Sequence, residues 1–487
     1  MSSRLITVYE DRTTRLELSD KEKQNIIALK ELWGSQNLIL QADGSLLLKH
    51  YVGFICRNGT RLQILPKVFA SGPVEKSGEE FEKGKAINLL LRLLSYSGFL
   101  NIKEIPDPIS VETYQNDLLE IFISIFINQF NKLFHREIHR SYQPYEENMQ
   151  FIKGRILFSQ TIKENAFRKH LHYVGYEEFT INNPLNRIIK TTMLRLISQT
   201  QVARNKKALK LALIHLEEVE PINLYPGIFN EVKFNRLNQN YRPLFNMAKM
   251  FYYNHQPGQS EGDEFTFTFL VPLNQLFEHY VYKLLDNSKI SGPGFYQVNH
   301  HKPQKYLASR NGESIFQLEP DITLIKDKTV VAILDAKYKN PFKEADVRVL
   351  QSDIYQMLAY AVAYHCFSIY LVYPFFSGNE ITDTELANYN ITTPAGNVSL
   401  KVIQLDIIDD EPEKIQVQLE NTLKDEMFTQ EGKTMEYVYP TLFLGQQAIP
   451  QDWLYNLELT EEIIQIADDL LIQYRNDDEW RQKYPGW

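Results

Sequence analysis

The sequence predicts an α+β protein of several domains, and three local patterns support this fold class. Short apolar runs separated by Asx-Gly turns fill residues 1–70, which indicates a β-rich N-terminal domain. Apolar residues at three- and four-residue spacing prevail over residues 85–260 and predict a mainly helical middle domain. Strand and helix patterns are mixed over residues 264–405, as in an α/β domain, and residues 406–487 form an acidic extension.

The N-terminal domain is expected to contain two hairpins and one helix, in a small barrel or sandwich. The predicted elements are a helix at residues 17–33, a hairpin at residues 38–48 with its turn at Asp43-Gly44, and a hairpin at residues 51–65 with its turn at Asn58-Gly59. A polar, glycine-bearing stretch at residues 71–84 is then expected to be a linker.

The later elements follow from the same periodicities. Helices are predicted at residues 86–94, 118–134, 186–197 and 206–216, the third of them starting just after Pro184. The α/β domain is expected to contain strands at residues 265–270, 314–318, 321–325, 329–336 and 368–373, and helices at residues 274–286 and 348–366. A further amphipathic helix is predicted at residues 461–474.

Composition narrows the class of protein. With 44% hydrophobic and 23% charged residues, the chain is not of the disordered or low-complexity type. Its two cysteines, Cys56 and Cys366, are too few for a disulfide framework or a multi-cysteine zinc site. The first residues show no secretory signal, so we expect a cytoplasmic protein. The uncharged stretch 357–376 is rich in tyrosine and predicts a buried helix followed by a buried strand rather than a membrane span.

Charge is unevenly distributed along the chain. The net charge is −9, yet residues 131–210 contain 15 Lys and Arg against 6 Asp and Glu, whereas residues 401–487 contain 7 against 19. A locally basic region can bind phosphates within an acidic chain, because the field near a surface is local. A solvated helical surface would carry the same charges.

The residues with the clearest chemistry lie on a predicted hairpin. Folding the chain antiparallel about Lys328 brings Asp321 opposite Asp335 and Glu319 opposite Lys337. Asp335 and Lys337 share a face, because they are two residues apart on one strand. Two carboxylates and an ammonium therefore converge, although Asp-x-Lys at a strand end can also be an ordinary surface ion pair.

Two converging carboxylates repel one another unless a cation lies between them. Oxygen ligands without cysteine or histidine favour Mg²⁺, with Mn²⁺ as the alternative. Such an ion polarises a phosphoryl group and activates water, and Lys337 could orient or deprotonate that water or neutralise charge in the transition state.

These motifs resemble those of the PD-(D/E)XK nuclease superfamily. Pro320-Asp321 and Asp335-Ala336-Lys337 resemble its two central motifs, Gln356 to Tyr360 resembles its Gln-x-x-x-Tyr motif, and Asn274 to Glu278 resembles its first core helix. The resemblance implies that Asp321, Asp335 and the Ala336 carbonyl bind the metal and that Lys337 is the catalytic lysine. It also implies that Glu278 faces the metal and that Gln356 positions DNA or water. Tyr360 is expected to pack, and Glu319 to pair with Lys337.

More narrowly, the chain resembles the McrC family, the nuclease subunits of McrBC modification-dependent restriction systems. The segments that carry this likeness are residues 53–67, 153–187 and 236–244. The resemblance implies an McrB-like AAA+ hexamer that hydrolyses GTP or ATP as partner, docked by the N-terminal domain, which stimulates its hydrolysis. It also implies cleavage of double-stranded, modified DNA that the partner recognises. The chain itself has no phosphate-binding loop of the Gly-x-x-x-x-Gly-Lys-Ser/Thr type.

Basic residues of the middle domain are candidates for phosphate contacts, which position DNA without reading its sequence. They are Lys153, Arg155, Arg168, Lys169 and Arg187. His170 and His172 lack companion ligands at helical spacing, so surface imidazoles are expected there.

Two other functions remain open from the sequence. The chain could be a non-catalytic activator or assembly hub of an AAA+ partner that keeps a vestigial nuclease fold. It could also be a stand-alone DNA repair nuclease.

Overall fold

The computed structural model describes most of the chain. The described residues are 4–29, 36–57, 60–67, 79–96, 117–134, 138–253, 255–256, 266–292, 296–310, 312–343, 346–377, 379, 381–393, 396–432, 443–444 and 447–448. The chain divides into two compact units, Met1–Glu420 and Asn421–Trp487. Only the end of a helix and the short hairpin β22 (Phe443–Leu444) and β23 (Gln447–Ala448) are described in the second unit. The helix predicted at residues 461–474 lies outside the described residues.

The N-terminal region is β-rich, as predicted. Its larger sheet has the order β1-β6-β5-β11-β10, formed by β1 (Leu5–Tyr9), β6 (Thr60–Leu65), β5 (Tyr51–Arg57), β11 (Thr266–Pro272) and β10 (His255–Gln256). A smaller sheet joins β2 (Thr14–Arg15), β4 (Ser45–Leu48) and β3 (Leu38–Leu40). Both predicted hairpins are confirmed, since β3 pairs with β4 and β5 with β6 in antiparallel fashion. The turn residues 58 and 59 lie outside the described residues.

Among the described residues of this region there is one helix, which begins three residues after the start of the predicted span 17–33; residues 30–33 of that span lie outside the described residues. It is α1 (Asp20–Ala28), which begins with a capping box in which Ser19 and Glu22 bond each other's backbone amides. These bonds satisfy amides that the first turn leaves without partners, and they fix the start of the helix.

Strand β11 crosses the predicted domain boundary. Residues 265–270 were assigned from sequence to the C-terminal α/β domain, but β11 pairs along its length with β5 of the N-terminal sheet. At Gly53 the backbones approach so closely that a Cβ would lie 1.9 Å from the carbonyl oxygen of Phe269, and the φ of Gly53 is +136°. Only glycine fits this contact.

The middle region contains the four predicted helices, α3 (Glu79–Tyr96), α5 (Leu118–Phe134), α7 (Pro184–Gln199) and α8 (Ala203–Ile214). It also contains helices that were not predicted, α9 (Ile228–Glu231) and α10 (Arg242–Tyr253), and a 3₁₀ turn η1 (Gln239–Tyr241). Helix α7 starts where Pro184 predicts it, and the side chain of Asn183 accepts a hydrogen bond from the Asn186 amide. Helix α3 begins at Glu79, so the predicted linker ends earlier than residue 84.

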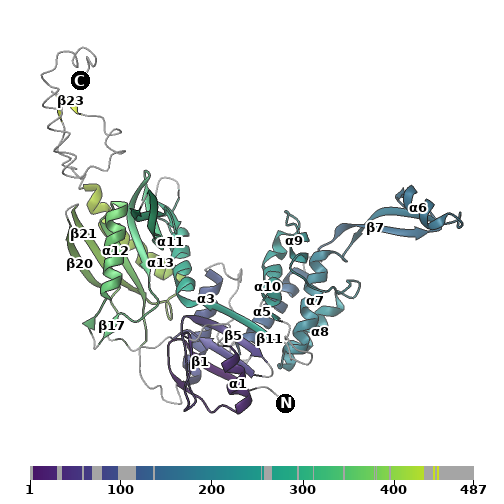
Figure 1. Ribbon diagram of the computed structural model, residues 1–487, viewed down its shortest axis with the longest axis horizontal. Coiled ribbons are helices and arrows are strands. Elements are labelled where there is room, and N and C mark those ends of the chain that lie inside the picture. The colour runs from purple at the N-terminus through teal and green to yellow at the C-terminus, as the bar shows by residue number, and fades with distance from the viewer. Residues whose placement is uncertain are drawn as a thin grey trace. The chain divides into compact units, whose positions relative to one another are not determined.

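The middle region also contains a sheet that helical periodicity did not predict. Strands β7 (Ser141–Met149) and β9 (His172–Thr180) pair over nine residues and, with β8 (Arg155–Ile156), form a three-stranded ribbon. The short helix α6 (Phe158–Asn165) packs on β9 (Figure 1). Most side chains of β7 and β9 remain at least partly exposed, so neither strand has the apolar alternation that marks a half-buried strand.

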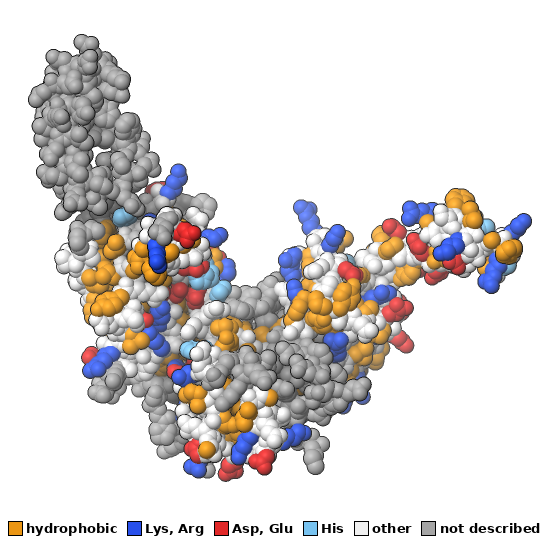
Figure 2. Space-filling view, viewed as in Figure 1, with side chains coloured by type: hydrophobic (Ala, Val, Ile, Leu, Met, Phe, Trp, Pro, Cys, Tyr) orange, Lys and Arg blue, Asp and Glu red, His pale blue; other side chains and the backbone are white. Residues whose placement is uncertain are grey.

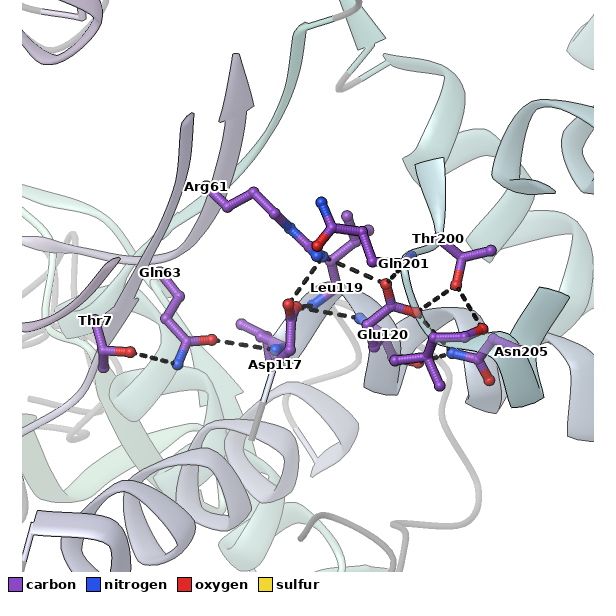
Figure 3. A network of polar contacts seen from close by, with 11 residues as sticks. Thr7, Arg61, Gln63, Asp117, Leu119, Glu120, Thr200, Gln201 and Asn205 are labelled. Carbon is purple, nitrogen blue, oxygen red and sulfur yellow. Dashed lines mark hydrogen bonds and ion pairs between the residues drawn. The ribbon is translucent and has the colours of Figure 1, made fainter. Parts of the chain in front are cut away.

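A buried polar network connects the N-terminal sheet to the helices (Figure 3). Arg61 of β6 lies 2.9 Å from Asp117 and 3.5 Å from Glu120, both at the start of α5. Glu120 in turn accepts hydrogen bonds from Thr200 and from Asn205 of α8. Both acids are nearly inaccessible to water, so the ion pairs are screened little by salt.

The C-terminal domain is built on a six-stranded mixed sheet. Its order is β12-β15-β16-β19-β21-β20, formed by β12 (Gln297–His300), β15 (Ile322–Lys326), β16 (Thr329–Ala336), β19 (Ser368–Pro374), β21 (Gly396–Leu405) and β20 (Glu385–Thr393). Strands β16, β19 and β21 are parallel, and the other pairings are antiparallel. Two small hairpins pair β13 (Lys305–Arg310) with β14 (Glu313–Leu318) and β17 (Phe342–Lys343) with β18 (Asp346–Val347).

Helices cover this sheet and enclose its core. Helix α12 (Gln351–Tyr364) lies against β19 and β21 (Figure 1), and its residues Met357 and Tyr360 join an apolar cluster with strand residues such as Leu371 and Val402. Helix α11 (Leu273–Asp286) packs against β12, β16 and α3. Helix α13 (Pro412–Gly432) follows β21.

The uncharged stretch 357–376 has the predicted form, the end of α12 followed by β19, whose seven residues are all buried. Within the described ranges, each helix is too short or too polar to cross a bilayer.

Candidate active site

The hairpin β15–β16 reaches the predicted register in an unexpected way. Its loop has only two residues, Asp327 and Lys328, which both have positive φ, as a type I′ turn requires. The register then shifts by one residue between Leu324 and Ile325, where Val331 is the extra residue of a bulge. Beyond the bulge, Ile322 pairs with Leu334, so the next pair along the ladder is Asp321 and Asp335.

Asp335 lies near the end of β16, next to the parallel strand β19, and Asp321 lies opposite it, just before the start of β15. Asp335 is completely buried, and an oxygen of Asp321 accepts a hydrogen bond of 2.8 Å from the Ala336 amide. Ala336 itself is 5% exposed, at the last position of the strand. The structure thus brings Asp321, Asp335 and the Ala336 backbone together, as the sequence predicts for their positions.

Lys337 faces the same site from the residue after β16. Its ammonium forms an ion pair with Oδ2 of Asp335 at 2.5 Å and donates a hydrogen bond of 3.2 Å to Oε1 of Gln356. Gln356 on α12 donates to the Tyr360 hydroxyl, which donates to the carbonyl of Glu319. This chain of bonds links the lysine to the segment just before Asp321 and limits the rotamers of Gln356.

Burial dominates the electrostatics of the pair. It raises the pKa of Asp321 well above its usual value, and the charges of Asp335 and Glu278 raise it further. Burial also raises the pKa of Asp335, against the opposing effect of the Lys337 ammonium. Burial alone would lower the pKa of Lys337, but the neighbouring carboxylate of Asp335 raises it above the usual value. The lysine is therefore charged at neutral pH in this arrangement.

The residues present fit a hard divalent cation. The buried Oδ1 of Asp335 accepts no hydrogen bond from any described residue, whereas Oδ2 faces the ammonium of Lys337. A buried carboxylate oxygen without a partner is costly, and a cation bound there would remove the cost. Asp321, Asp335 and the Ala336 carbonyl supply only oxygen ligands, which Mg²⁺ and Mn²⁺ prefer.

Glu278 lies close by, but its direct contacts are with histidines that the sequence interpretation did not single out. It is 8% exposed on α11, and its Oε1 lies 2.5 Å from Nε2 of His300 and 2.7 Å from Nε2 of His301. The predicted pairing of Glu319 with Lys337 is not formed. Glu319 instead accepts a hydrogen bond from Gln304, and its Oε1 lies 3.7 Å from Nδ1 of His301. The pairing was wrong because the strand β15 begins only at Ile322, so the ladder does not extend to residue 319.

A second lysine near the site was also missed. Lys339 makes a 2.5 Å ion pair with Asp353 of α12, and Asp353 is itself 8% exposed. The Asp335-x-Lys337-x-Lys339 alternation was visible in the sequence, but nothing in it indicated the partner on a helix.

The candidate phosphate-binding residues do not gather in one place. Lys153, Arg155, Arg168 and Lys169 belong to the β7–β8–β9 ribbon and to the segments beside α6, whereas Arg187 lies on α7 and bonds Asn182 and Glu220. Lys153 lies 3.8 Å above the ring of Tyr176. Figure 2 shows basic and apolar side chains side by side on the ribbon, whose exposed apolar residues include Phe151, Ile152, Phe158 and Phe167.

The sequence of this chain matches one family profile and one curated relative. Residues 46–374 match the sequence profile of the family described as McrBC 5-methylcytosine restriction system component. One curated relative is the Type IV methyl-directed restriction enzyme EcoKMcrBC of Escherichia coli (strain K12), 23% identical over 259 residues, which are 50% of this chain and 72% of that protein.

A solved structure shares the fold over most of the chain. It is the half-complex from a tetradecameric assembly of Thermococcus gammatolerans McrB AAA+ hexamers with bound McrC. The similarity has a TM-score of 0.66 at 20% identity, and it covers 86% of this chain and 100% of that one.

Proposed function

Because this chain belongs to the McrBC restriction-system family, as an McrC-type subunit, we propose that it is the metal-dependent DNA endonuclease of such a system. It cleaves phosphodiester bonds of double-stranded, modified DNA while bound to an McrB-like AAA+ hexamer, whose GTP or ATP hydrolysis it stimulates. The assembly of McrB hexamers with bound McrC from Thermococcus gammatolerans supports this choice of partner. We place the reaction in the cytoplasm.

One observation carries the nuclease proposal: the fully buried carboxylate of Asp335, with an oxygen that has no partner, beside Asp321 and Lys337. A site that served only structure would have no reason to retain a buried carboxylate oxygen without a partner. The arrangement is also difficult to reconcile with a vestigial nuclease fold.

Each residue has a separate task in the proposed reaction. Asp321, Asp335 and the Ala336 carbonyl hold Mg²⁺, with Mn²⁺ as an alternative, and when bound the ion supplies phosphoryl polarisation and a more acidic water. Lys337 keeps its ammonium beside the scissile phosphate and neutralises charge that develops in the transition state. Its raised pKa favours this electrostatic task over that of a general base.

Gln356, Glu278 and the basic residues have supporting tasks in the proposed reaction. Gln356 accepts a hydrogen bond from Lys337 and restrains the ammonium, and it also lies near enough to the site to position DNA or water. Glu278 adds a third negative charge near the pair, which increases the demand for a cation. The basic residues of the ribbon, and Arg187 apart from them, contact DNA phosphates or the acidic surface of the partner.

The test is cleavage of methylated and unmethylated plasmid by the full chain together with its AAA+ partner. We expect cleavage only with Mg²⁺ and loss of cleavage when a chelator is added. Asp335→Ala and Lys337→Ala should each lower the rate by at least about 10²-fold, the usual effect of removing one preorganised electrostatic group.

Two controls separate loss of chemistry from loss of assembly. Nucleotide hydrolysis by the partner should be unchanged in both variants, and Lys328→Gly, which removes a lysine from the turn of the same hairpin, should cleave normally. Cleavage that persists in both Asp335→Ala and Lys337→Ala would refute the assignment of the site.

A further inference from the structure

Glu278, His300 and His301 form a second cluster of potential metal ligands. One ligand atom from each of these residues lies within 4.8 Å of the other two. Glu278 is nearly buried, and the side chains of His300 and His301 are 17% and 36% exposed. The cluster is therefore sheltered but open to solvent on the histidine side, as an ion-binding site must be.

The backbone is bent so that both imidazoles reach one carboxylate. His300 ends β12, where it pairs with Ile322, and consecutive strand residues normally point to opposite faces of a sheet. His301 escapes this alternation because its φ is +53°, a conformation that few residues other than glycine adopt. Its amide is held in place by a hydrogen bond of 3.1 Å to the carbonyl of Asp321. An unusual backbone conformation at such a place often accompanies a functional site.

The hydrogen-bonding pattern of His301 is incomplete without an ion. Its Nε2 faces Glu278, and its buried Nδ1 has no hydrogen-bond partner among the described residues, although Oε1 of Glu319 lies 3.7 Å away. Metal-bound histidines commonly direct their second nitrogen, as a donor, at a carboxylate. A metal on Nε2 would leave the proton on Nδ1, facing Glu319.

We propose that Glu278, His300 and His301 bind a divalent transition-metal ion of the Zn²⁺ type, at a site beside Asp321 and Asp335 but with none of its ligands in common. Two imidazoles and one carboxylate favour zinc, iron or cobalt over magnesium and manganese, which prefer oxygen ligands. The nitrogen and oxygen atoms now in contact need only open to about 3.3 Å for tetrahedral coordination with bonds near 2.0–2.1 Å. The site goes beyond the proposed nuclease function, because it would hold an ion of different chemistry.

Cobalt provides a direct probe of such a site. The full chain, freed of metal by dialysis against a chelator, is titrated with Co²⁺ while its visible ligand-field absorption is recorded, and Zn²⁺ is then added. We expect a band that saturates at one equivalent of Co²⁺ and disappears on addition of Zn²⁺. His300→Ala, His301→Ala and Glu278→Gln should each weaken binding by at least about tenfold.

Two further variants fix the position of the ion. Asp335→Asn should retain the band while losing DNA cleavage, which separates this proposal from that for the nuclease. His170→Ala, an exposed histidine on the ribbon, should bind Co²⁺ like the wild type. Loss of the band in Asp335→Asn with normal binding in both His300→Ala and His301→Ala would overturn the proposal.

A measurement on the wild type avoids any dependence on the folding of the variants. X-ray absorption at the zinc edge of the protein loaded with one equivalent of Zn²⁺ should show scattering from two imidazoles. An all-oxygen coordination sphere, or no Co²⁺ band in the wild type, would equally refute the site.

Discussion

At the scale of single residues, the buried pair Asp321 and Asp335 determines how the site behaves without metal. Both carboxyls have raised pKa values, mainly because burial disfavours their charged forms. In the unfolded chain the same carboxyls titrate near 3.9. Between the unfolded and the raised folded pKa, the folded protein binds more protons than the unfolded chain. Its stability therefore falls as the pH rises through that interval.

The predicted fall in stability with rising pH can be tested. We expect the melting temperature of the metal-free protein to decrease as pH rises from about 4 through the raised pKa values. Asp335→Asn removes one of the two titrating groups, so its melting temperature should decrease less and exceed that of the wild type at the upper end. Thermal unfolding across pH, with a chelator present, measures both. Parallel curves for the two proteins would contradict the assignment of buried charge to Asp335.

The sequence predicted part of this residue set. Asp321, Asp335 and Lys337 could be found because they are related by strand alternation and by one hairpin register, both of which are local. His300 and His301 could not be placed by those rules, since their contact with Glu278 depends on a positive φ at His301 and on a helix 22 residues earlier. The adjacent histidines His300 and His301, about 20 residues before Pro320-Asp321, were the available signal.

At the scale of elements, the bulge at Val331 sets the register of the hairpin β15–β16. Without the extra residue, the pairing of Lys326 with Thr329 would extend to Asp321 opposite Leu334. A one-residue shift turns every side chain to the other face of the sheet, so the two carboxylates would no longer face each other. The bulge thus reconciles a tight two-residue turn with the register that the site requires.

A substitution in the two-residue turn of this hairpin should increase the stability of the protein. Lys328 has a φ of +67°, a conformation that glycine adopts without steric cost. We expect Lys328→Gly to stabilise the protein by about 0.5 kcal/mol, because relief of the left-handed strain of about 1–2 kcal/mol exceeds the added entropy of the unfolded glycine. Urea unfolding measures this change. Destabilisation would mean that the lysine side chain makes a contact stronger than the strain.

Elements with an apolar face were the predictable ones. Helices α5 and α7 and strand β19 follow the expected spans closely, because burial imposes a period on their sequences. The ribbon of β7 and β9 was missed because partly solvated strands held by backbone hydrogen bonds require no such period. Predicting it would have required pairing residues that are 23 to 39 positions apart in the chain, from Met149 with His172 to Ser141 with Thr180.

At the scale of the whole molecule, Arg61 holds two regions together through buried charge. Its side chain is 5% exposed, and its guanidinium forms ion pairs with Asp117 and Glu120 at the start of α5. Burial raises the pKa of Asp117, an effect that Arg61 opposes. The network therefore depends on one cation for two acids.

Removing that cation should be costly. We expect Arg61→Ala to destabilise the protein by about 3–5 kcal/mol, because it leaves buried carboxylates without compensation. Arg187→Ala is the matched control: its partner Glu220 is 72% exposed, so the loss should stay within about 1 kcal/mol. Urea midpoints compare the two. Similar midpoints would show that the acids of the network are protonated rather than paired with Arg61.

The strand β11 limits how this protein can be dissected. Phe269 and Val271 are buried where β11 pairs with β5, and Phe269 contacts Phe54 of that strand. The strand passes at Pro272 directly into α11, the helix of Glu278. Cutting away the first 70 residues would strip β11 of its neighbour and uncover those side chains in water. Such a truncated chain, if inactive, would reveal nothing about partner docking, so the contribution of the N-terminal sheet has to be probed by point substitutions on its outer surface.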